Sequence, residues 1–131
     1  MLKKQRIDSF RRITVSESGM RQTIEYEILR KNGKAEISLY DISYCDGEKR
    51  RVLRKRALCD EGCVLDALNK CRVFGWNGFY GRHPRGVRDG TAFSFFAEIN
   101  GGVEIKASGS QKFPKFYRDF TDLLYGVLEE C

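Results

Sequence analysis

The sequence predicts an α+β fold with a largely antiparallel sheet, two helices on one face and the order ββββαββα. Three observations predict it. Patterns of period two recur along the chain, Asn-Gly or Asp-Gly turns separate several of them, and apolar stripes at helical spacing occur in two segments. A length of 131 residues fits a single domain over residues 1–131.

Short strands separated by glycine turns account for the first part of the chain. Residues 10–15 form a first predicted strand. In residues 23–29, Ile24, Tyr26 and Ile28 alternate with polar side chains, which is typical of a half-buried strand. Asn32-Gly33 then favours a tight type I′ hairpin turn.

The next two strands, at residues 35–44 and 49–58, are less regular. In the first, the apolar set shifts phase after Leu39, which we interpret as a β-bulge. Asp46-Gly47 gives a second hairpin turn. The second strand contains KRRVLRKR and has no clean apolar face, which predicts an edge strand.

Two helices and a further hairpin complete the pattern. Asp60 is placed to cap a helix over residues 61–71, whose apolar stripe is Val64, Leu65, Leu68 and Cys71. Residues 91–99 and 103–107 predict a hairpin. A final helix is expected with Pro114 near its first turn; its expected apolar stripe is Phe116, Phe120, Leu123 and Val127, flanked by Tyr117, Leu124 and Leu128.

Composition narrows the class of protein. Apolar residues make up 41% of the chain, and no apolar run approaches the roughly 20 residues that span a bilayer. The N-terminus lacks an apolar signal segment, so we expect a cytoplasmic protein with no membrane partner. An odd number of cysteines favours thiols, and we expect neither a cofactor nor a metal, although four thiolates could hold zinc. The cysteines are Cys45, Cys59, Cys63, Cys71 and Cys131.

The C-terminal third carries a resemblance. Residues 89–95 read DGTAFSF, a GGVEIKASGS stretch follows, and F-P-x-F occupies residues 113–116. This succession resembles a pattern of small uncharacterised bacterial proteins, in which an Asp-Gly precedes an aromatic strand, a glycine hairpin and a Pro-led terminal helix. The resemblance implies a bacterial origin and the α+β layout, and it implies no activity.

Residues 75–90, GWNGFYGRHPRGVRDG, are the best candidate binding loop, because sixteen residues without periodicity are unusual in a compact domain. Flat aromatic rings beside forked arginine donors suit stacking and anion contact with a macromolecule. Alternatively, the aromatic residues fill the core while the arginines are solvated. The candidate binding residues are Trp76, Tyr80, Arg82, His83, Arg85 and Arg88.

The basic surplus gives a second candidate. Lys and Arg exceed Asp and Glu by six, and six cations occur within residues 49–56. Such a run could contact several phosphates of a nucleic acid. It could also serve only to protect an edge strand from aggregation. The residues of this run are Lys49, Arg50, Arg51, Arg54, Lys55 and Arg56.

No constellation of an enzyme is evident. His83 is the only histidine, and no cysteine lies in a nucleophile motif beside it. The paired carboxylates Glu25 and Glu27 are typical of the solvent-facing side of a half-buried sheet. We therefore expect a non-enzymatic interaction module, and we favour a protein over a nucleic acid as its partner. A homodimer formed through a sheet edge is an alternative.

Overall fold

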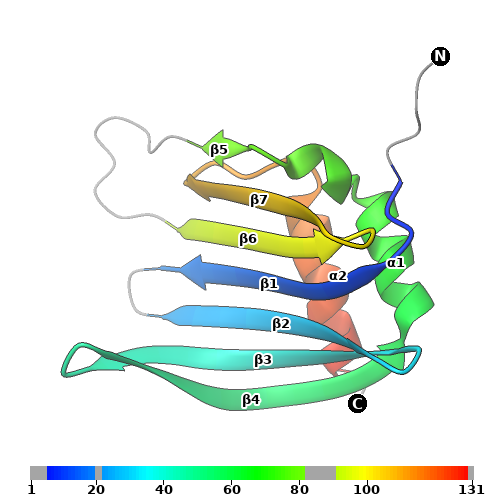
Figure 1. Ribbon diagram of the computed structural model, residues 1–131. Helices are drawn as coiled ribbons and strands as arrows, with labels where there is room; N and C mark the ends of the chain where they lie inside the picture. The colour runs from blue at the N-terminus through cyan, green and yellow to red at the C-terminus, as the bar shows by residue number, and fades with distance from the viewer. Residues whose placement is uncertain (1–5, 20–21, 82–90, 130–131) are drawn as a thin grey trace.

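The computed structural model describes residues 6–19, 22–81 and 91–129 (Figure 1). It is an α+β fold with a mostly antiparallel sheet, which confirms the predicted class. The strands are β1 (Phe10–Ser18), β2 (Thr23–Lys31), β3 (Lys34–Cys45), β4 (Glu48–Asp60), β5 (Tyr80–Gly81), β6 (Ala92–Ile99) and β7 (Val103–Ser110). The helices are α1 (Glu61–Lys70), the short 3₁₀ helix η1 (Val73–Trp76) and α2 (Tyr117–Glu129).

The sheet has the strand order β4-β3-β2-β1-β6-β7-β5. Neighbouring strands are antiparallel except β5, which runs parallel to β7. The strand β5 departs from the predicted order, because it lies inside the segment expected to be a loop. Only two residues pair there, which is too short a stretch to leave a period in the sequence.

One face of the sheet supplies most of the core. The register aligns Val15 of β1 with Tyr26 of β2 and with Phe95 of β6, so these side chains form a row across three strands. All three are buried and belong to one cluster that also contains Leu68 of α1 and Phe120 of α2. In Figure 1 both helices are seen behind the sheet.

The predicted hairpin turns are confirmed by their backbone angles. Asn32 and Gly33 have φ angles of 48° and 79°, and Asp46 and Gly47 have 53° and 80°. Two successive residues at positive φ are what a type I′ turn requires, and its twist matches that of the strands. These turns fix the registers of β2–β3 and β3–β4.

The bulge predicted in β3 lies instead in its partner. Leu39 pairs with Lys55 and Tyr40 pairs with Leu53, so Arg54 of β4 is the additional residue. The β2–β3 register runs without interruption. The change of phase in β3 has another cause: Leu39 and Tyr40 point to opposite faces, and both are buried.

The helices begin differently from each other. Asp60 caps α1 as predicted, since its side chain accepts a hydrogen bond from the Gly62 N–H at 3.1 Å. The helix α2 begins later than expected, because Phe116 has a φ of 68° and cannot belong to a right-handed helix. Pro114 therefore precedes the helix and is not in its first turn.

The predicted apolar stripe of α2 was also rotated from the observed one. Leu123 is 42% exposed, and the buried face consists of Tyr117, Phe120, Thr121, Leu124 and Leu128. No helix among the described residues is both long enough and apolar enough to cross a bilayer.

Candidate functional site

The ring of Trp76 is part of the core. Only 3% of the residue is exposed, and its ring centroid lies 5.0 Å from that of Phe95 and 5.9 Å from that of Phe120. Its indole N–H donates to the Lys115 carbonyl at 3.1 Å. Trp76 was a candidate binding residue, with filling of the core as the alternative; its burial fits the alternative, because η1 turns the ring between the sheet and α2.

The other candidate binding residues of residues 75–90 differ in how the structure describes them. Tyr80 in β5 is 74% exposed and accessible. The neighbouring Phe79 packs beside Phe93 with ring centroids 6.1 Å apart. The remaining predicted residues lie outside the described residues: Arg82, His83, Arg85 and Arg88.

The basic run lies on β4, which ends the sheet. Among the described residues β4 pairs with β3 alone, so no strand borders its other side. Nearly the whole strand is exposed, with Ala57 as its one buried residue. This position confirms the predicted edge strand.

Most cations of the basic run form ion pairs within the chain. Five of the six have a carboxylate partner, and Arg50 is the exception in the described part of the chain. The pairs are Lys49–Glu25 at 3.5 Å, Arg51–Glu25 at 3.5 Å, Arg51–Glu27 at 3.4 Å, Arg54–Asp41 at 3.5 Å, Lys55–Glu129 and Arg56–Glu36 at 3.5 Å.

Glu25 and Glu27 were expected on the solvent-facing side of the sheet, yet each is only 8% exposed. They lie on the face of β2 opposite the core, beneath the cations of β1 and β4. Arg12 donates to Glu27 at 3.1 Å, which adds to the pairs with Arg51. Buried carboxylates are stable only when such partners compensate for lost hydration.

Arg51 covers an aromatic ring on the same face. Its guanidinium carbon lies 3.9 Å from the centroid of Tyr40, a geometry that favours a cation–π contact. Burial opposes ionisation of this phenol, but hydrogen bonds from Arg56 and Arg51 outweigh it and lower the pKa of Tyr40. Tyr40 is 8% exposed and is therefore not free to stack on a nucleic-acid base.

Exposed apolar side chains accompany these charges on β4. Val52 is 58% exposed, Leu53 44% and Leu58 60%. Tyr44 of β3, close to the same hairpin, is 68% exposed. The edge thus combines an open backbone, half-exposed cations and apolar side chains, which suits contact with another polypeptide.

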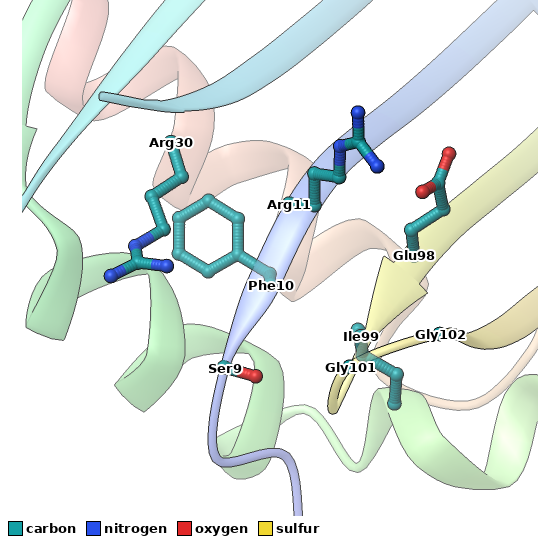
Figure 2. Close-up of a pocket in the computed structure, with 8 residues that line it drawn as sticks. All are labelled: Ser9, Phe10, Arg11, Arg30, Glu98, Ile99, Gly101 and Gly102. Carbon is teal, nitrogen blue, oxygen red and sulfur yellow. The ribbon is translucent and has the colours of Figure 1, made fainter. Parts of the chain in front are cut away.

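A pocket of about 380 Å³ lies at the end of the sheet where β1 begins (Figure 2). Arg11, Arg30 and Glu98 line it together with the glycines of the β6–β7 turn. Figure 2 shows the Arg30 guanidinium turned toward α1, where Glu61 holds it at 2.8 Å. The charges of this pocket are therefore partly satisfied within the chain.

The cysteines do not converge on a described metal site. Cys45 and Cys63 are exposed, whereas Cys71 is buried, and burial raises the pKa of the Cys71 thiol. Within the described ranges, no three Cys, His, Asp or Glu side chains are grouped closely enough to hold a metal ion.

Glu17 interacts with two buried tyrosines, Tyr117 of α2 and Tyr26 of β2. The Tyr117 hydroxyl donates to Glu17 Oε2 at 2.9 Å. Burial and the Glu17 charge raise the pKa of Tyr26 to about 12. The same causes, with the hydrogen bond, raise the pKa of Tyr117. Both tyrosines are packed inside the core, so this arrangement stabilises the fold and offers no surface for a ligand.

Comparison with protein-family models, with curated proteins and with solved structures finds no match to this chain. The resemblance seen in residues 89–116 therefore stays a prediction.

Proposed function

We propose that the chain is a non-enzymatic interaction module that takes up an extended segment of a partner protein as an additional strand beside β4. In strand addition, backbone hydrogen bonds supply affinity and alternate side chains supply selectivity. The observation that carries the proposal is that β4, with 13 residues, ends the sheet and is exposed along nearly its whole length. Among the described residues β3 alone pairs with β4, and the end of α2 reaches the strand through the Lys55–Glu129 ion pair.

Protection of the edge from aggregation accounts for the charges of β4 but not for its exposed apolar side chains. Edge strands resist aggregation through charges, prolines and bulges, and the cations and Arg54 of β4 fit that description. Exposed Val52, Leu53 and Leu58 weaken such protection. Their presence in the same strand favours a surface that is covered when a partner binds.

The alternative, nucleic-acid binding through residues 49–56, has less support. Glu25, Glu27 and Glu36 lie among the cations that would meet the phosphates, and they would repel them. Tyr40 is covered by Arg51. A protein segment, which can carry carboxylates at chosen positions, fits this pattern of charges better.

The test begins with a display library of random ten-residue peptides. The tightest binder is then synthesised with one N-methyl group at each backbone position in turn. Strand addition predicts that every second N-methyl group weakens binding, because only alternate N–H groups face β4. Uniform sensitivity along the peptide, or binding of mixed-sequence RNA in place of any peptide, would contradict the proposal.

Proline variants of the protein give the matched control. Adjacent residues of a strand direct their N–H groups to opposite sides, so Val52→Pro and Leu53→Pro each remove a different one. One variant loses a hydrogen bond to β3 and is destabilised. The other variant retains its stability but no longer binds the peptide. If both variants still bind the peptide, β4 is not the binding edge.

A further inference from the structure

We infer that the segment bound by β4 alternates acidic and apolar side chains on one face, and that it is not a second copy of β4. This inference rests on the proposed function and specifies its ligand. It is carried by the order of side chains on the face of β4 that points away from the helices.

The register fixes that order. Arg51 stands opposite Ile42, Leu53 opposite Tyr40, Arg56 opposite Ser38 and Leu58 opposite Glu36. The β3 residues are two apart, so they share one face of the sheet. From Arg51 to Leu58 this face therefore reads cation, apolar, cation, apolar, and Lys49, opposite Tyr44, adds one more cation before Arg51. These four alternating side chains are Arg51, Leu53, Arg56 and Leu58.

The bulge at Arg54 is what creates this order. Without an additional residue, Arg51 and Leu53 would share a face with Lys55 and Ala57. Because Arg54 is inserted between the Leu53 and Lys55 pairs, Arg56 takes the next position on the face. A ligand strand would complement it with an acid and an apolar residue at successive alternate positions.

The cations retain capacity for a ligand despite their ion pairs. On this face five cations share three carboxylates: Arg12, Lys31, Lys49, Arg51 and Arg56 with Glu25, Glu27 and Glu36. Each of these cations is 35–55% exposed, and an arginine carries five N–H donors. The excess of positive charge favours carboxylates on the incoming strand.

A second copy would not satisfy this surface. An antiparallel β4 from another molecule would bring residues 49–56 opposite the same basic residues. Like charges directly across a strand pair are destabilising. Charge complementarity therefore selects an acidic segment of a different protein, and we expect the chain itself to sediment as a monomer.

The test uses a synthetic peptide with Glu and Val alternating on one face and Thr on the other, Glu-Thr-Val-Thr-Glu-Thr-Val-Thr. Binding is followed by the amide NMR shifts of β4. A second peptide has Lys in place of Glu. We expect the acidic peptide to bind at least about tenfold more tightly than the Lys peptide.

Arg56→Gln and Arg50→Gln remove the same charge from opposite faces of β4. Arg56→Gln should weaken binding of the acidic peptide several-fold, whereas Arg50→Gln should have a smaller effect. Leu58→Thr, at a 60% exposed position, provides a second variant if Arg56→Gln fails to fold.

The outcomes separate the two proposals. Equal binding of the acidic and Lys peptides at β4, or a dimer that Val52→Pro or Leu53→Pro dissolves, overturns the inference; the first of these leaves strand addition intact. If neither designed peptide binds but a library peptide does so with alternating N-methyl sensitivity, the inference is wrong and the proposed function stands. If no peptide binds along β4, both are wrong.

Discussion

The sheet ends at one edge with β5, a strand of two residues, and at the other with β4, a strand of 13 residues. The short edge is closely packed. The backbone of Lys112 passes so near Gly81 and Gly109 that a Cβ on either glycine would clash with the Lys112 carbonyl oxygen. Among the described residues the long edge has no such cover. All six of its cations and three of its apolar side chains, Val52, Leu53 and Leu58, are exposed.

This difference indicates that the two edges of the sheet have different roles: the short edge contributes to stability, and the long edge is available for binding. Aromatic side chains gather beside the short edge, where Trp76, Phe93, Phe113 and Tyr117 pack against one another or their neighbours. Charge pairs gather beside the long edge. Substitutions near β5 and β7 should therefore change the free energy of unfolding, whereas substitutions on the exposed side of β4 should change binding.

The largest effect is expected for Trp76→Ala. Loss of this buried ring should lower the free energy of unfolding by about 3–5 kcal/mol, measured by urea denaturation. Tyr80→Ala, at a residue 74% exposed, is the control and should stay within about 0.5 kcal/mol of the parent chain. Similar losses in both variants would contradict the placement of Trp76 in the core.

A smaller loss is expected for Gly109→Ala. The added methyl group would meet the Lys112 carbonyl and the Phe93 ring, and overpacking of this kind costs about 1–3 kcal/mol. Gly126→Ala in α2 is the matched control, because apart from its chain neighbours and the adjacent backbone of α2 no described atom lies within 4 Å of its Cβ position. That change should stabilise the helix by up to about 1 kcal/mol. Equal effects would show that the short edge is not closely packed.

Alkaline pH should lower the free energy of unfolding because of the two buried tyrosines. Because the pKa of Tyr26 and of Tyr117 is raised in the folded chain, the unfolded chain releases these protons first, from about pH 10 upward. Their contribution to stability is complete below pH 10 and is lost as the pH rises toward 12 and above. Tyr117→Phe should reduce this loss by about 1.4 kcal/mol per pH unit, measured by denaturation at several pH values. An unchanged slope would contradict the burial of Tyr117.

The smallest effect is expected on β4 itself. Arg51→Gln removes contacts to Glu25, Glu27 and Tyr40 and should lower the free energy of unfolding by about 1 kcal/mol. Arg50→Gln should leave it within about 0.5 kcal/mol, since Arg50 has no ion pair in the described part of the chain. Thermal unfolding of both variants checks the difference. A larger loss for Arg50→Gln would contradict the observed ion pairs.

Hairpins and the edge strand could be predicted because their signals are local. Asn32-Gly33 and Asp46-Gly47 specify turns by themselves, and the lack of an apolar face in residues 49–58 indicates an edge. The start of α2 could not be predicted in this way. The left-handed conformation of Phe116 leaves no mark in a stripe of apolar residues, so the helix was expected to begin near Pro114.

The candidate site was predicted only in part. The basic run itself is visible in the sequence, but its ion pairs depend on the register of β4 against β3 and β2. Glu25 alternates with apolar residues as an exposed acid would, and its burial depends on cations more than 20 residues away in the sequence. The order of Arg51, Leu53, Arg56 and Leu58 on one face depends on the bulge at Arg54, which no single segment reveals.

Amide hydrogen exchange of β4, with and without the Glu–Val peptide, tests the central claim most directly. If an extended segment joins the sheet at this edge, alternate amides between Lys49 and Leu58, those that do not donate to β3, should gain protection when the peptide binds. Protection that appears elsewhere in the sheet while every β4 amide stays unchanged would contradict the account.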